Sequence, residues 1–189
     1  ANLTVTIHAD GTASVMDGTN AVDRADVVER VVGGSGTNQF AFADGADFAG
    51  SLAGGSGTAN LLDYSACTDG VWVDLAGGTA TGTTGISGFR RVTGGAGNDV
   101  LTGDASANTR SGGAGHDTLT GGAGADTLTG EAGDDVYVLA VGSTDTVTEA
   151  AGGGVDTLDY SAYGAAILVD LGLGTAPGTT GVTNIERVI

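Results

Sequence analysis

Carboxylates recur at a fixed spacing in a glycine-rich part of this chain. From Gly94 the sequence divides into five blocks of nine residues: GGAGNDVLT, GDASANTRS, GGAGHDTLT, GGAGADTLT and GEAGDDVYV. The sixth position of each block holds an oxygen-bearing side chain: Asp99, Asn108, Asp117, Asp126 and Asp135. Carboxylates and main-chain carbonyls are the ligands that Ca²⁺ prefers. The spacing therefore indicates a series of calcium-binding turns.

Each block reads as a turn followed by a short strand. Glycines at positions one, two and four permit a tight turn with positive φ, and the apolar eighth position supplies one inward-facing side chain of a strand. Such a unit cannot bury itself alone, so successive units must stack. Stacking aligns the sixth-position carboxylates in columns, where a cation is needed to relieve their repulsion. Block 103–111 is degenerate, because it has lost two glycines, its aspartate and its apolar residue, which is replaced by Arg110.

Residues 94–138 resemble the repeats-in-toxin (RTX) nonapeptide G-G-x-G-x-D-x-U-x. The resemblance implies an all-β fold, a right-handed parallel β-roll or β-solenoid in which consecutive nonapeptides alternate between two sheets. It also implies several Ca²⁺ ions, each between a turn and the turn two units later. Asp99, Asp117 and Asp135 would then share one column, and Asn108 and Asp126 the other. The full set of expected metal-binding residues is Asp99, Asn108, Asp117, Asp126, Asp135, Asp145, Asp156, Gly95, Gly97, Gly113, Gly115, Gly122 and Gly124.

Degenerate units extend the pattern on both sides. GGSGTNQFA at 33–41 has Asn38 at its sixth position, and GGSGTANLL at 54–62 has no carboxylate there. Asp145 comes ten residues after Asp135, one residue out of register, and Asp156 recovers the frame. We expect these coils to keep the turn and partly lose the metal. For Asp47 and Asp145 an exposed turn aspartate is an equally good interpretation.

A longer repeat lies behind the nonapeptides. Residues 62–93 align with residues 158–189 at a constant offset of 96, with 17 of 32 positions identical. Both copies contain an apolar strand, VWVDL at 71–75 and ILVDL at 167–171. We expect these connectors to continue the solenoid as wider coils; a separate small β-domain is the alternative. The dipeptide Arg-Val precedes the Gly-Gly turn that begins at Gly94. The same dipeptide comes just before Ile189, so we expect a further coil, or a second copy of the chain, to stack beyond Ile189.

The predicted organisation is one continuous solenoid in six parts: 1–32 a degenerate β connector, 33–62 degenerate RTX-like coils, 63–93 a β connector, 94–138 the nonapeptide block, 139–157 degenerate RTX-like coils and 158–189 a β connector.

Composition excludes several classes of protein. The chain has 189 residues, 37 of them Gly, and a net charge of −17; all six basic residues are Arg. This charge opposes binding to nucleic acid or anionic membranes. No apolar run approaches the 18 or so residues of a membrane span, and the single cysteine, Cys67, forms no intramolecular disulfide.

Catalytic motifs are missing as well. The two histidines, His8 and His116, lie in no recognisable motif, so the Asp-Tyr-Ser steps at 63–65 and 159–161 predict a packed tyrosine and an aspartate-capped turn rather than a catalytic serine. Trp72 is expected in the core or half-buried on a strand. We therefore predict no enzymatic activity in this chain.

Two functions fit these observations. The first is a calcium-folded structural or adhesive segment of a large extracellular bacterial protein, such as a surface layer, an adhesin or a matrix filament, associating with itself or with neighbouring repeats. The second is a calcium-binding, secretion-linked accessory module of a secreted enzyme or toxin. The RTX resemblance implies type I secretion and folding outside the cell in either case. The reiterated 96-residue unit favours the first, since it builds length rather than a pocket.

Overall fold

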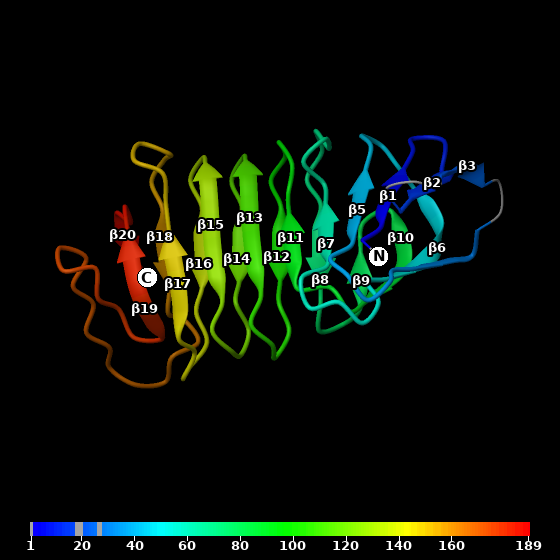
Figure 1. Ribbon diagram of the computed structural model, residues 1–189. Helices are drawn as coiled ribbons and strands as arrows, with labels where there is room; N and C mark the ends of the chain where they lie inside the picture. The colour runs from blue at the N-terminus through cyan, green and yellow to red at the C-terminus, as the bar shows by residue number, and fades with distance from the viewer. Residues whose placement is uncertain (1, 18–20, 26–27) are drawn as a thin grey trace.

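The computed structural model describes residues 2–17, 21–25 and 28–189, and within these residues every regular element is a β-strand (Figure 1). The strands belong to three sheets. The largest, of ten strands, runs in the order β19 (Thr179–Thr183), β17 (Asp145–Thr148), β15 (Thr127–Ala132), β13 (Thr109–Ala114), β11 (Arg91–Thr93), β7 (Leu61–Asp63), β5 (Gln39–Phe42), β1 (Thr4–Ile7), β2 (Ala13–Met16) and β3 (Ala21–Ala25).

The other two sheets lie along the opposite side of the coil. The seven-stranded sheet runs in the order β20 (Arg187–Val188), β18 (Thr157–Asp159), β16 (Val136–Val138), β14 (Thr118–Thr120), β12 (Val100–Thr102), β8 (Trp72–Asp74) and β9 (Thr79–Ala80). The three-stranded sheet contains β10 (Thr83–Ser87), β6 (Phe48–Ala53) and β4 (Arg30–Val32). From β11 onwards the chain alternates between the ten-stranded and the seven-stranded sheet.

Parallel pairing dominates, which confirms the predicted all-β fold with parallel strands. In the nonapeptide block Val92 pairs with Arg110 and Arg110 with Leu128, so one full coil takes 18 residues, or two nonapeptides. In the first connector, β7 and β8 pair in the same way with β11 and β12, whereas β9 pairs antiparallel with β8. The strands therefore stack side by side along one axis from β5 to β19 (Figure 1).

The N-terminal end departs from this parallel pattern. β1 pairs with β2, and β2 with β3, in the antiparallel direction. β1 and β2 are joined by a tight turn at Asp10-Gly11, where Gly11 has φ +77° and its N–H donates to His8 O over 2.9 Å. An Asp-Gly pair between strands is a strong hairpin signal.

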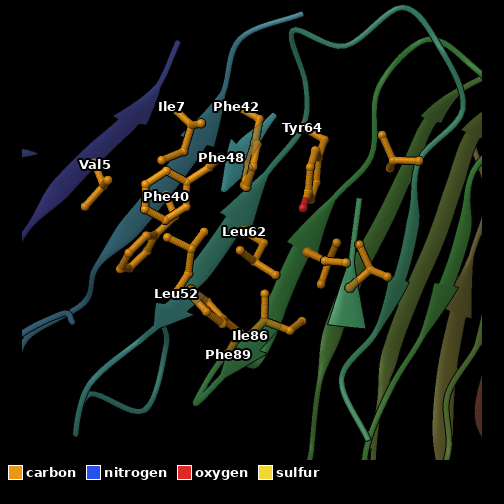
Figure 2. Close-up of a cluster of buried hydrophobic side chains, with 14 of the residues drawn as sticks. Val5, Ile7, Phe40, Phe42, Phe48, Leu52, Leu62, Tyr64, Ile86 and Phe89 are labelled. Carbon is orange, nitrogen blue, oxygen red and sulfur yellow. The ribbon is translucent and has the colours of Figure 1, made fainter. Parts of the chain in front are cut away.

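The core forms two clusters of buried side chains. The first extends from Val5 to Leu101 and is aromatic; Phe40 meets Phe89 edge-on at 5.0 Å, and Phe42 stacks on Tyr64 at 4.4 Å between ring centroids (Figure 2). The second comprises Leu119, Leu128, Tyr137, Leu139, Val147, Leu158, Tyr160, Ala176, Val182 and Ile185. Trp72 remains 46 % exposed on β8, so it is a half-exposed strand residue.

The 96-residue repeat is also a repeat of contacts. Tyr64 donates its hydroxyl to Thr81 O over 2.9 Å, and Tyr160 donates to Pro177 O over 2.8 Å. The carboxylates that precede these tyrosines each accept the N–H of a serine two residues on, at 3.0 Å for Asp63 and 2.7 Å for Asp159. Both Asp-Tyr-Ser steps are thus a packed tyrosine with an aspartate-capped turn.

Candidate calcium-binding turns

The sixth-position residues of one column are linked from coil to coil by hydrogen bonds. Each Asp accepts, at Oδ1, the N–H of the equivalent residue one coil earlier: Val71 to Asp99 at 2.7 Å, Asp99 to Asp117 at 2.8 Å, Asp117 to Asp135 at 2.7 Å and Asp135 to Asp156 at 2.9 Å. All four carboxylates are buried. The parallel register of the strands that follow these residues builds this acidic column.

A second acidic column lies before the strands of the ten-stranded sheet. Asn108 N–H donates to Asp126 Oδ1 over 2.7 Å, and Asp126 N–H donates to Asp145 Oδ1 over 3.0 Å. Asp145 is fully buried, so it belongs to the column and is not an exposed turn residue. Asp47, in contrast, is exposed. The coil absorbs the extra residue before Asp145, because Thr127 pairs with Thr146 and the ladder continues.

The second oxygen of each carboxylate, Oδ2, bears on whether these turns can bind a cation. Four of them make no hydrogen bond within the described residues: Oδ2 of Asp117, Asp126, Asp135 and Asp145. Burying a charged oxygen without a partner is costly. A divalent cation bound to these atoms would remove that cost, and the free oxygens are the observation that best fits calcium at these turns.

Position-one glycines bring a second kind of oxygen to the same place. A Cβ on Gly112 would lie 2.1 Å from Asp117 Oδ2 and 2.9 Å from Gly130 O. A Cβ on Gly94 would lie 2.0 Å from Asp99 Oδ2 and 2.2 Å from Gly112 O. The bare glycine therefore leaves space between a carboxylate and a carbonyl of the next coil, which are the donors that Ca²⁺ combines.

Glycines at the other two positions serve the stacking of turns. Gly113, Gly115, Gly122 and Gly124 have φ between +90° and +116°, as the tight turn requires, whereas Gly95, Gly97 and the position-one glycines do not have positive φ. A Cβ on Gly113 would lie 2.2 Å from Gly95 O, and one on Gly115 2.5 Å from Gly97 O. Carbonyl coordination of Ca²⁺ by these six glycines remains a prediction.

Burial changes the acidity of the column residues. Loss of solvent raises the pKa of Asp117, Asp126 and Asp135 to about 6, against the opposing effect of the N–H donors. It also raises the pKa of Asp99 and Asp156. A buried carboxyl group with a raised pKa ionises with difficulty, and a nearby positive charge favours its ionised form. Such groups therefore indicate a candidate cation-binding site.

Glu149 is a member of the site that the sequence pattern did not reveal. Its side chain is 3 % exposed, with Oε1 accepting the N–H of Gly130 over 2.7 Å. Oxygens of Asp135, Glu149 and Asp156 all lie within 4.8 Å of one another. A Cβ on Gly130 would lie 2.3 Å from Glu149 Oε1, the position that a carbonyl of the next coil takes at Gly94 and Gly112.

Burial raises the pKa of Glu149 to about 7. The glutamate precedes the altered turn AAGGGVD, in which the glycine spacing of the nonapeptide is lost, so only that irregularity could have drawn attention to it.

The degenerate coils 33–62 close their turns with amides. Asn38 Nδ2 donates to Gly36 O over 2.9 Å and to Gly54 O over 2.8 Å. Asn60 Nδ2 donates to Gly57 O over 2.8 Å and to Gly88 O over 3.0 Å. These N–H donors satisfy the turn carbonyls directly, which explains how such coils keep their shape without aspartate.

Other residues considered from the sequence lie away from these columns. His116 is exposed, and its Nδ1 accepts Asp134 N–H over 2.8 Å on the outside of the turns. Cys67 is buried, and this burial raises the pKa of its thiol. The described part of the chain contains no helix long and apolar enough to cross a membrane.

The fold and the turns together define a parallel β-solenoid with carboxylate-lined turns. Comparison with protein families gives the same result, since residues 91–119 and 111–143 match the family model described as RTX calcium-binding nonapeptide repeat (4 copies). The resemblance seen in the sequence is thereby confirmed for residues 91–143, which match RTX calcium-binding nonapeptide repeats. A search among curated proteins found no match to the chain.

Proposed function

We propose that this chain is a calcium-folded structural or adhesive segment of a large extracellular bacterial protein, without catalytic activity of its own. The observation that carries the proposal is the pair of buried carboxylate columns with free Oδ2 atoms at Asp117, Asp126, Asp135 and Asp145. Without a cation these columns oppose folding, because like charges are held together away from water. With Ca²⁺ the free energy of ion binding becomes free energy of folding.

The architecture favours a structural role over an accessory module. The contacts of the 62–93 connector recur in the 158–189 connector, so the chain reiterates one unit along one axis. An elongated solenoid made of stacked units offers length and a regular surface. Export in an unfolded state and folding outside the cell are consistent with this chemistry, and stacking on neighbouring repeats or on a second copy is part of the proposal.

Circular dichroism tests the central claim. The β-sheet signal and the melting temperature should rise with Ca²⁺ up to millimolar concentration, and Mg²⁺ should substitute poorly, because it demands tight octahedral geometry and keeps its waters. An identical spectrum and melting temperature in chelator and in Ca²⁺ would contradict calcium-driven folding. Light scattering of the calcium-loaded chain then tests self-association: a strictly monomeric chain contradicts that part alone.

A further inference from the structure

Arg110 lies inside the solenoid in the row of inward-facing side chains. Its exposed fraction is 0 %. It pairs in register with Val92 on β11 and Leu128 on β15, both buried apolar residues. A guanidinium in such a row is costly unless it is paired, because charge is removed from water.

The guanidinium reaches out of the row into the turn. Nη2 of Arg110 donates to Gly121 O over 2.8 Å and to Asn108 Oδ1 over 3.0 Å. Its other two nitrogens make no hydrogen bond within the described residues. Burial lowers the pKa of Arg110, and the charges of Asp126, Asp145 and Asp104 oppose this effect. The guanidinium is thus held by a carbonyl and an amide oxygen with carboxylates nearby, and these are the kinds of group that surround a bound cation.

The position of this nitrogen matches the space beside the other position-one glycines. A Cβ on Gly103 would lie 1.6 Å from Arg110 Nη2 and 2.3 Å from Gly121 O. A Cβ on Gly94 would instead lie close to Asp99 Oδ2 and to the carbonyl oxygen of Gly112. In the block 103–111 a nitrogen cation therefore lies where the regular blocks bring together a carboxylate oxygen and a carbonyl of the next coil.

The amide-closed coils show that an N–H donor can fill this place. A Cβ on Gly33 would lie 2.8 Å from Asn38 Nδ2 and 2.3 Å from Gly54 O. A nitrogen donor and a carbonyl of the next coil thus meet beside a position-one glycine in coils with and without aspartate columns. Arg110 differs from asparagine in bringing a full positive charge, which the neighbouring Asp126 requires.

We propose that the Arg110 guanidinium takes the place of a calcium ion in the turn 103–108, as a cation built into the chain. The two departures of this block then complement each other. Asn108 keeps an accepting Oδ1 but lacks the negative charge that a metal ion would balance at the sixth position, and Arg110 supplies a positive charge. The inference rests on the proposed calcium binding by the regular turns and assigns one turn of the array to an internal ion.

Restoring the consensus residues tests this inference. The variant N108D/R110L copies the pattern of Asp126 and Leu128, and it should bind one more Ca²⁺ per chain than the wild type, counted by native mass spectrometry under saturating calcium. The matched control is N98D/R91L, which makes the same chemical change at two exposed residues and should leave the count unchanged.

The outcomes separate the two claims. Calcium on the wild type with no gain in N108D/R110L overturns the inference about Arg110 alone. No calcium on any variant overturns the proposed function and this inference together. A gain in the control equal to that in the test variant shows binding by added charge and overturns the inference as well.

A measurement on the wild-type chain guards against a variant that fails to fold. In the calcium-loaded protein labelled with ¹⁵N-arginine, the guanidinium hydrogens of Arg110 should exchange slowly with water, since the group is buried and donates two hydrogen bonds. Arg30, Arg91 and Arg187 are exposed and give the fast-exchange reference, and R110K identifies the signal. Rapid exchange at Arg110 would overturn the assignment.

Discussion

At the scale of single residues, the turns are closed by two kinds of chemistry. Asn38 and Asn60 satisfy carbonyls directly through N–H donors, whereas Asp117 and Asp135 present free carboxylate oxygens that call for a cation. The sequence predicted the aspartate columns because their period is nine and the strands between them are short. It did not predict Glu149, whose place depends on how the chain folds back beside Gly130.

Neighbouring aspartates in one turn offer a matched test of the columns. Asp135 is buried with a free Oδ2, while Asp134 is exposed and accepts Val155 N–H over 2.8 Å. Both D135N and D134N remove one charge and keep the accepting oxygen. We expect D135N to raise the calcium concentration at the folding midpoint by about tenfold, corresponding to ~1.4 kcal/mol, and D134N to leave it nearly unchanged. Equal midpoints in calcium titrations followed by circular dichroism would show that general charge binds the metal.

The raised pKa values of the buried carboxyl groups predict opposite effects of pH with and without calcium. Burial raises the pKa of Asp117, Asp126 and Asp135 to about 6 and that of Glu149 to about 7, so the calcium-free folded state binds protons more tightly than the unfolded chain. Its stability should therefore be greatest below about pH 4, where unfolded carboxylates are also protonated, and fall as pH rises to about 7. Urea unfolding of metal-stripped protein at pH 4.5 and pH 7.5 measures this difference.

Calcium should reverse that slope. Protons compete with Ca²⁺ for the same oxygens, so the apparent calcium affinity should rise between about pH 5 and pH 7. Isothermal calorimetry across this range checks the sign. A calcium-free chain that gains stability towards neutral pH is incompatible with buried, uncompensated carboxylates.

At the scale of elements, the nonapeptide pattern predicted the turn and the strand correctly, but it assigned one role, positive φ, to glycines that have different roles. Positive φ occurs at positions two and four of the blocks that begin at Gly112 and Gly121, as at Gly113 and Gly115, but not at Gly95 and Gly97 of the first block. Gly112, at position one, has no positive φ. Glycine is needed there because a side chain would occupy the space next to Asp117 Oδ2. The distinction depends on the neighbouring coil, which a single repeat unit cannot contain. The Asp10-Gly11 turn is a local signal, and it explains the antiparallel pairing of β1 with β2.

A methyl group at position one should therefore obstruct the ion although it requires no unusual φ. In G112A the new Cβ would lie 2.1 Å from Asp117 Oδ2, so we expect a smaller calcium-induced rise in melting temperature than in the wild type. G164A is the control, since nothing lies within 4 Å of the Cβ that it adds. Differential scanning calorimetry with and without Ca²⁺ gives the comparison, and an undiminished calcium effect in G112A would place the ion elsewhere.

At the scale of the whole molecule, the equivalent first and last strands of the two connectors lie in opposite sheets. β7 begins the first connector in the ten-stranded sheet, while its equivalent β18 lies in the seven-stranded sheet. The same exchange holds for β11 and β20. An odd number of nonapeptides separates the copies, and each nonapeptide moves the chain to the other face. The repeat of 96 residues was predicted from the sequence. The change of sheet between equivalent strands follows from the number of nonapeptides that lie between the two connectors.

The structure also divides into two halves that differ in their cores and in how their turns are closed. The half before Leu101 has the aromatic core of Phe40, Phe42 and Tyr64 and turns closed by Asn38 and Asn60. The half after it has the second, mainly aliphatic core and the carboxylate columns. Arg110 stands between the two clusters as the buried residue that interrupts the apolar row.

We therefore expect unequal protection when calcium is removed. In chelator at neutral pH, amide hydrogens of β5 and β7 should remain protected from exchange, because their turns are satisfied by N–H donors and their side chains are buried without charge. Those of β14 and β16 should exchange quickly, since their strands follow Asp117 and Asp135 in the uncompensated column. Hydrogen–deuterium exchange by mass spectrometry resolves the two segments, and millimolar Ca²⁺ is the control that should protect both. Equal loss of protection in both halves would mean that the chain folds as one calcium-dependent unit, and that the amide-closed coils cannot stand without the ion-bound ones.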